Sequence, residues 1–176
     1  DSIMTFSPDG RRLAASDADG GIWVHDVSTG ARQAVLLGHA GEVYGLSFSP
    51  DGRRLISGGA DMSVRLWDVA SMRQIHIYRG HTAGAGYGVL GVAFSSDGRS
   101  LVSSGYDMVV KVWDASFGEP TATETADNNT SLATEFSVDR RTSVEYLTLS
   151  GHQRSIEALS VSLDGTRAAT ASLDGT

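Results

Sequence analysis

Residues 38–68 read GHAGEVYGLSFSPDGRRLISGGADMSVRLWD, a stretch that begins with a Gly-His pair and ends with a Trp-Asp pair. Apolar residues alternate over 43–48 and lead into Asp51-Gly52, a dipeptide that favours a hairpin because it tolerates the positive φ angles of a type I′ turn. Three more strands are predicted by the runs at 55–57, 64–67 and 74–78. We therefore expect four short antiparallel strands in succession.

The same phrase returns along the chain at a nearly fixed interval. Phe-Ser-x-Asp-Gly begins at residues 6, 48 and 94, and a weaker Val-Ser-Leu-Asp-Gly begins at 161, so the intervals are 42, 46 and 67 residues. A second marker keeps these intervals: Asp19, Asp61, Asp107 and Asp174. Two independent markers in one register indicate an internal repeat, and a period of about 40–45 residues is typical of a four-stranded propeller blade.

The repeat divides the chain into units at about 1–37, 38–79, 80–150 and 151–176. This predicts an all-β fold in which blades of four antiparallel strands form a partial, unclosed ring. The first unit starts within its inner strand and the fourth stops before its Trp-Asp strand. We therefore expect a piece of a longer array, or half of a ring that another chain completes.

Two insertions interrupt the period. Four residues are added in the Gly-rich stretch between His81 and Phe94, and about 25 are added after the third Trp. Residues 116–141 are polar and rich in Thr, Ala and acids, which predicts a mobile loop. The outer strand of the third unit is then expected at 144–149.

The ordered set of Gly-His, Phe-Ser-Pro-Asp-Gly, Asp and Trp-Asp resembles the WD-repeat β-propeller family over nearly the whole chain except residues 116–141. The resemblance implies that a His, a Ser or Thr, an Asp and a Trp of one blade form a buried hydrogen-bond chain. An indole only donates, a carboxylate only accepts, and a hydroxyl and an imidazole do both, so these groups can satisfy one another. The matching residues are His39, Ser57, Asp61 and Trp67 in unit two, His81, Ser103, Asp107 and Trp113 in unit three, and His152, Thr170 and Asp174 in unit four.

His, Ser and Asp are also the side chains of a hydrolase triad. A catalytic Ser needs an exposed, strained turn with an oxyanion hole beside it, whereas Ser57 and Ser103 fall in the interiors of predicted strands. The set also recurs with the repeat, so we expect a structural network and no catalytic residue. The first unit departs from the pattern, because His25 stands at the Trp position and Ala15 at the Ser position, which leaves Asp19; Trp23 is displaced by two.

The sequence predicts no cofactor and no metal. Residues 86–91, GYGVLG, fit the dinucleotide-binding pattern, but that pattern needs a strand before it and a helix after it, and here a strand follows. Residues 17–20, DADG, lack the third ligand and the distal Glu of a calcium loop. The absence of Cys excludes a thiolate metal site and favours a cytoplasmic location.

A formal charge of −7 argues against nucleic acid or an anionic membrane as a partner, and no apolar run reaches the length of a membrane span. Arginines that follow each Asp-Gly, at 11, 12, 53, 54, 99 and 167, predict a solvated rim of mixed charge.

The family resemblance implies a non-catalytic scaffold in a larger signalling or regulatory protein. Its partner, a protein or peptide, would bind on the rim that carries the leading loops (from each Gly-His to the inner strand) and the second turns. Aromatic, Met and Arg side chains are enriched in interface cores. Large residues expected there are Tyr44, Met62, Tyr87, Tyr106, Met108 and Arg154. Ordinary surface or interblade packing is an equal alternative for them. Two other functions stay open: a self-assembling array whose half-rings pair, and a propeller enzyme.

Overall fold

The strands of the chain form successive antiparallel sheets. The computed structural model describes residues 2–82, 87–116, 145–162 and 167–175. Three sheets have four strands each, in the order of the chain, and a fourth sheet has two. Within the described ranges there is no helix. The predicted all-β fold of four-stranded antiparallel sheets in an unclosed array is thereby confirmed.

The strands have the following bounds. The first sheet contains β1 (Met4–Phe6), β2 (Arg12–Ser16), β3 (Ile22–Asp26) and β4 (Arg32–Leu36). The second contains β5 (Val43–Phe48), β6 (Arg54–Gly59), β7 (Ser63–Asp68) and β8 (Arg73–Arg79). The third contains β9 (Val89–Phe94), β10 (Ser100–Gly105), β11 (Val109–Asp114) and β12 (Glu145–Ser150), and the last contains β13 (Ile156–Val161) and β14 (Ala168–Ser172).

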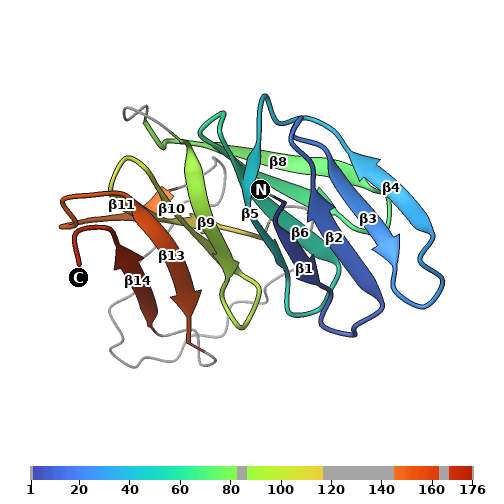
Figure 1. Ribbon diagram of the computed structural model, residues 1–176. Coiled ribbons are helices and arrows are strands. Elements are labelled where there is room, and N and C mark those ends of the chain that lie inside the picture. Colours follow the sequence, from blue (N-terminus) through green and yellow to red (C-terminus); the bar gives the residue numbers. More distant parts are fainter. Residues whose placement is uncertain (1, 83–86, 117–144, 163–166, 176) are drawn as a thin grey trace, which may run out of the picture.

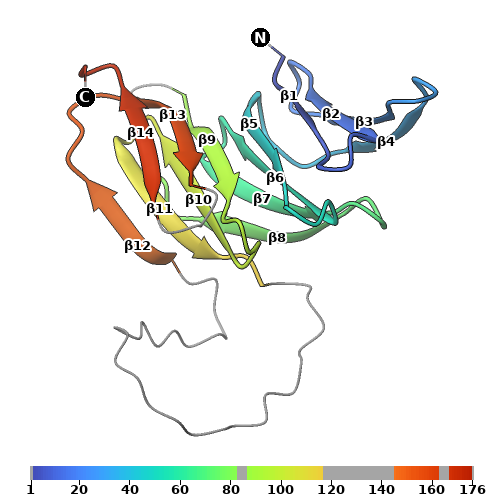
Figure 2. The ribbon, with the colours of Figure 1, turned by 90° about the horizontal axis from the view of Figure 1, so that it is seen from below.

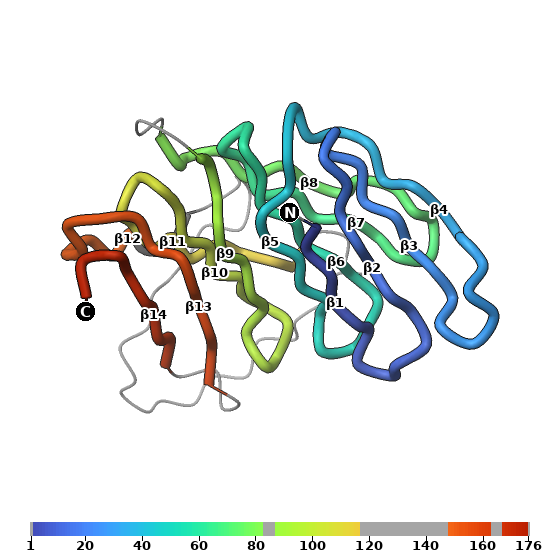
Figure 3. Tube along the Cα trace, in the orientation of Figure 1, coloured from blue at the N-terminus to red at the C-terminus, as the bar shows by residue number. Residues whose placement is uncertain are grey.

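The sheets stand side by side like blades of an open fan (Figure 1). The inner strands β1, β5, β9 and β13 lie next to one another, and the outer strands β4, β8 and β12 lie on the far side (Figure 2). The tube in Figure 3 follows the same course from the blue first sheet to the red last strands. Because the strands are antiparallel, the Asp-Gly turns lie at one end of the blades, and the leading loops and second turns lie at the other.

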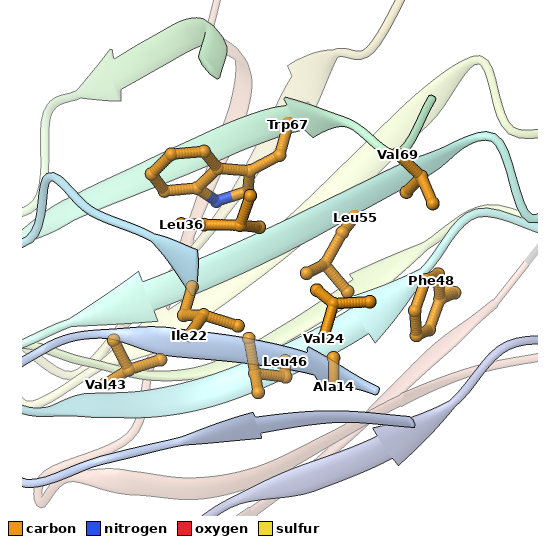
Figure 4. Packing of buried hydrophobic residues seen from close by; sticks show 10 residues of the cluster. All are labelled: Ala14, Ile22, Val24, Leu36, Val43, Leu46, Phe48, Leu55, Trp67 and Val69. Atoms are coloured by element: carbon orange, nitrogen blue, oxygen red, sulfur yellow. The ribbon is translucent and has the colours of Figure 1, made fainter. Parts of the chain in front are cut away.

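Apolar side chains between neighbouring sheets form the core. Ala14, Ile22, Val24 and Leu36 of the first sheet face Leu46, Phe48, Leu55 and Trp67 of the second (Figure 4). A separate cluster joins the second sheet to the third. Every residue of β6 is buried, since both faces of that strand are covered. A strand that is buried on both faces does not alternate between apolar and polar residues, and the sequence therefore predicted a strand at 55–57 alone.

The Asp-Gly turn is not of the predicted type. Gly52 N donates to Ser49 O at 2.8 Å, and Gly52 has φ +69°, while Asp51 has no positive φ. A type I′ turn needs positive φ at both central residues, so the prediction is wrong. The turn is type I, with Pro50 at the position that favours proline and the glycine following in the left-handed region. Asp51 instead accepts hydrogen bonds from Ser49 Oγ at 2.6 Å and Arg53 N at 3.0 Å.

Arg54 also differs from the expected solvated rim, because it is buried between two sheets. Its Nη2 donates to Gly98 O at 2.8 Å, and its Nη1 donates to Ala115 O. The guanidinium carbon lies 5.5 Å from the centre of the Phe94 ring. All three contacts belong to the third unit, so Arg54 fastens the second sheet to the third.

The insertions lie largely outside the described residues. Of the predicted loop at 116–141 only Ser116 is described, and residues 83–86 of the Gly-rich stretch are not. The outer strand predicted at 144–149 corresponds to β12, which pairs with β11.

Candidate functional site

A chain of four side chains crosses one face of the second sheet. Trp67 Nε1 donates to Ser57 Oγ at 2.8 Å, and Ser57 Oγ lies 2.7 Å from His39 Nε2. His39 Nδ1 lies 2.9 Å from Asp61 Oδ1. Because the Asp61 carboxylate can only accept, the neutral imidazole carries its proton on Nδ1. Nε2 is then an acceptor, so the Ser57 hydroxyl donates to Nε2 and accepts the indole N–H. Ser57 is fully buried and His39 and Trp67 nearly so.

Asp61 accepts hydrogen bonds from residues of the leading loop and of the second turn and strand β7. Its donors besides His39 are Ala40 N at 3.2 Å, Ser63 Oγ at 2.7 Å and Arg65 Nη2 at 3.2 Å. Burial alone raises the pKa of Asp61, but the hydrogen bonds from His39 and Ser63 outweigh burial and hold that pKa well below its ordinary value. The carboxylate therefore ties the leading loop, through Ala40, to the turn between β6 and β7.

The third unit repeats this geometry. Trp113 Nε1 donates to Ser103 Oγ at 2.8 Å, Ser103 Oγ lies 2.7 Å from His81 Nε2, and His81 Nδ1 lies 2.9 Å from Asp107 Oδ2. Asp107 also accepts the Thr82 backbone N–H at 3.0 Å. Burial raises the pKa of Asp107, and the His81 hydrogen bond more than reverses that effect. Ser103 is as fully buried as Ser57, so neither hydroxyl is open to a substrate.

The fourth unit carries the first part of the same chain. His152 Nε2 lies 2.9 Å from Thr170 Oγ1, and His152 Nδ1 lies 3.1 Å from Asp174 Oδ2. Asp174 accepts the Gln153 backbone N–H at 2.7 Å. The His–hydroxyl–Asp part of the set thus recurs once in each of three consecutive units, as expected for a structural feature of the repeat.

The first unit replaces the network with a different pair. Trp23 Nε1 donates to Asp17 Oδ2 at 2.5 Å, and Asp17 also accepts the Gly21 backbone N–H at 2.7 Å. Asp19, the one residue of the first unit that matches the network in the sequence, is exposed. The hydrogen bonds from Trp23 and Gly21 lower the pKa of Asp17. The sequence analysis missed Asp17 because it considered only Asp19, the residue at the repeat position of Asp61. The signal that could have identified Asp17 was a second acidic residue at the start of the turn that precedes Trp23.

Three of the six candidate binding residues meet on the rim. The rings of Tyr44 and Tyr87 lie 5.6 Å apart at 87°, and those of Tyr87 and Tyr106 lie 5.9 Å apart at 67°. Tyr87 is 59% exposed. Tyr44 Oη donates to Glu42 Oε2 at 2.9 Å. Burial, followed by this hydrogen bond, raises the pKa of Tyr44 to about 12. We call Tyr44, Tyr87 and Tyr106 the rim tyrosines.

Met62 and Met108 occupy the second turns beside this group. Their φ angles are +61° and +64°, at the repeat position where the first and fourth units have Gly20 and Gly175. Met108 is 40% exposed. A side chain at such an angle carries roughly 1–2 kcal/mol of strain that glycine would not.

Arg154, the sixth candidate, lies in the leading loop of the fourth unit. It is exposed, and its Nη1 donates to Leu173 O at 3.1 Å. Among the described residues no ring contact or hydrogen bond joins Met62, Met108 or Arg154 to the rim tyrosines.

The glycine pattern at 86–91 has a structural explanation where it is described. A Cβ built on Gly88 would lie 2.1 Å from Gly59 O and 2.9 Å from Ala60 O, so the glycine allows two backbones to approach. The strand β9 follows it, and not a helix. In the described ranges, no group of three or more His, Cys, Asp or Glu is placed to hold a metal ion, and no helix could cross a membrane.

Comparison with protein families gives one match. The description of that family is "WD domain, G-beta repeat", and the matched segments are residues 2–26, 30–68, 72–114 and 143–176. They cover most of the chain and leave out the whole of the insertion at 116–141. No curated protein sequence matches the chain.

Proposed function

The chain belongs to the WD domain, G-beta repeat family, whose repeats indicate a protein-interaction domain, and we propose that it binds a protein or peptide segment on the rim of the leading loops and second turns. The observation that carries this proposal is the group of rim tyrosines, which brings together residues 44, 87 and 106 from two units. The proposed role is that of a non-catalytic scaffold.

The rim tyrosines have the properties of an interface anchor. Tyrosine offers a large amphipathic surface with few rotatable bonds, so its side chain loses little conformational entropy when a partner binds. Tyr87 is held edge-on between Tyr44 and Tyr106, and the bond from Tyr44 to Glu42 fixes one end of the group. Such a surface is preorganised, which lowers the cost of binding.

The buried networks support the same surface from below. Asp61 and Asp107 bind the backbones of Ala40 and Thr82, which lie in the leading loops of units two and three. We assign these networks a positioning role, since a fully satisfied buried network rigidifies the loops that it joins.

Two of the three methionines with left-handed φ angles, Met62 and Met108, lie on the same rim, and the third, Met72, lies in the turn between β7 and β8. Backbone strain is retained most often at sites of function, and Met62 and Met108 keep left-handed angles where other units have glycine. Met side chains adapt to varied partner surfaces. We further assign the chain four blade units, at about 1–37, 38–79, 80–150 and 151–176, and place it within a larger cytoplasmic signalling or regulatory protein. These assignments rest on the rim surface, the family and the absence of Cys.

A displayed peptide library selected on the 176-residue chain tests the proposal. Peptides enriched on the wild type should bind the Tyr87→Ala variant at least about tenfold more weakly, as expected for loss of a central aromatic anchor. Phe6→Ala is the matched control, because Phe6 is an aromatic residue that is also 59% exposed, on β1. Equal affinity for wild type and Tyr87→Ala would refute the rim as the binding surface.

Self-association is a second candidate, favoured by the apolar face of β1. Met4 and Phe6 are 62% and 59% exposed, whereas Phe48 and Phe94 at the Phe6 position of the next units are 7% and 8% exposed. Further blades, from the same or another chain, would cover this face. Native mass spectrometry would show a dimer that Phe6→Asp abolishes; a monomer at all concentrations would exclude pairing of half-rings.

A further inference from the structure

The rim tyrosines stand beside a carboxylate that has no cationic partner. Glu42 is half-buried, and Tyr44 Oη donates to its Oε2 at 2.9 Å. Among the described residues no Lys, Arg or His side chain forms an ion pair with Glu42. An ionised carboxyl group has about four acceptor positions, so most of those on Glu42 remain for a ligand. A cation that arrives with the ligand would compensate this partly buried charge.

Tyr87 presents an aromatic surface next to the same carboxylate. Its side chain is 59% exposed, and its ring centre lies 5.6 Å from that of Tyr44, the residue that holds Glu42. The face of an aromatic ring carries partial negative charge and attracts cations. A ring surface and a carboxylate on either side of Tyr44 therefore favour a ligand group that is both flat and positively charged.

The charges of the leading loops and second turns favour a basic partner as well. In the sequence these segments are residues 17–21, 37–42, 60–62, 80–88, 106–108, 151–155 and 173–175. They contain one arginine, Arg154, and six carboxylates, those of Asp17, Asp19, Glu42, Asp61, Asp107 and Asp174. At the opposite end of the blades, the Asp-Gly turns 7–11, 49–53 and 95–99 each contain one Asp and one Arg. A negative potential on the rim alone attracts basic segments to it and repels acidic ones.

Of the two basic side chains, arginine suits this arrangement better than lysine. The guanidinium group is planar, so one face can lie on an aromatic ring while the N–H groups at its edge point to a carboxylate. It is also more weakly hydrated than an ammonium group, which lowers the cost of taking it out of water.

We propose that the segment bound on the rim carries an arginine, whose guanidinium lies on the ring of Tyr87 and donates to the carboxylate of Glu42. This inference rests on the proposed function, in which the rim is the binding surface, and adds the chemistry of the residue that the rim selects. Glu42 is then a specificity-determining residue, and Tyr44 positions it through the hydrogen bond from Oη.

Two peptide libraries test this selectivity. They differ at one central position, which is arginine in one library and glutamine in the other, and their remaining positions exclude Arg, Lys and His. We expect the peptides whose binding depends on Tyr87 to come from the arginine library. Recovery of such peptides equally from both libraries would overturn the arginine and leave the rim as the binding surface. Recovery from neither library would overturn both proposals.

Calorimetric titration of the 176-residue chain with the tightest peptide of the arginine library measures the effect of the charge. Citrulline has nearly the shape of arginine but is neutral, so its substitution for the central arginine should weaken binding about tenfold or more. Equal affinities of the two peptides would overturn the proposal. This comparison uses the wild-type chain and is independent of the folding of any variant.

Two protein variants locate the carboxylate. Glu42→Gln keeps an acceptor for Tyr44 Oη and removes the charge, so the affinity for the arginine peptide should fall about fivefold or more. Asp51→Asn is the matched control, because it removes the same charge at the opposite end of the same sheet, where Asp51 also accepts a hydroxyl at 2.6 Å. It should leave the affinity within about twofold. Equal effects of the two substitutions would overturn the assignment of Glu42.

Discussion

Removal of the Ser57 hydroxyl tests the structural role of the buried network. In Ser57→Ala the Trp67 indole N–H and His39 Nε2 both lose their partner at a site that is 0% exposed. A buried polar group left unpaired costs roughly 1–3 kcal/mol. Because two groups share one site and can relax together, we expect the free energy of unfolding to fall by about 2–4 kcal/mol.

Urea unfolding followed by circular dichroism measures this change. Ser47→Ala is the control. Among the described residues the Ser47 hydroxyl donates only to its neighbour's carbonyl, Phe48 O, at 3.4 Å, so the loss should be below about 0.5 kcal/mol. Ser57→Thr keeps the hydroxyl, as Thr170 does in the fourth unit, and should recover most of the stability. A Ser57→Ala protein as stable as Ser47→Ala would refute the reasoning. So would loss of a hydrolase activity without loss of stability.

Three further predictions concern other contacts. The pKa of Asp61 is lowered by folding, so its contribution to stability is present above the ordinary value near 3.8 and is lost as the pH falls below it; acid titration of Asp61→Asn should show a flatter decline. Arg54→Met leaves the Gly98 carbonyl without its donor and should cost roughly 1–3 kcal/mol in thermal or urea unfolding, whereas exposed Arg53→Met should cost under about 0.5 kcal/mol; equal losses would show that Arg54 does not fasten the sheets. Met108→Gly relieves roughly 1–2 kcal/mol of backbone strain in the folded state and adds about 0.4–1 kcal/mol of chain entropy to the unfolded state. The unfolding temperature should therefore stay the same or rise, while the affinity for a rim ligand falls. A lower unfolding temperature would contradict this.

The repeat made much of the fold predictable. The networks of His39 and His81 could be located because each residue recurs at a fixed place with a donor or acceptor role that its chemistry dictates. The outer strand near residue 145 followed from the period alone.

Other features depend on tertiary packing that the pattern does not carry. Arg53 and Arg54 are the same residue type in one turn, yet only Arg54 is buried, because the third sheet lies on its side. The hydrogen bond from Trp23 to Asp17 depends on the conformation of the turn between β2 and β3. The contacts of Tyr87 with Tyr44 and Tyr106 likewise join side chains of two units, and no repeat marker in the sequence carries them.

Hydrogen–deuterium exchange of the chain with a peptide selected on it tests the central claim most directly. Binding on the rim predicts slower exchange at residues 38–44, 87–89 and 105–108, and unchanged exchange at the Asp-Gly turns 50–53 and 96–99 at the opposite end of the blades. Tyr87→Ala should remove the protection. Protection confined to the Asp-Gly turns, or protection that survives the loss of Tyr87, would contradict the account.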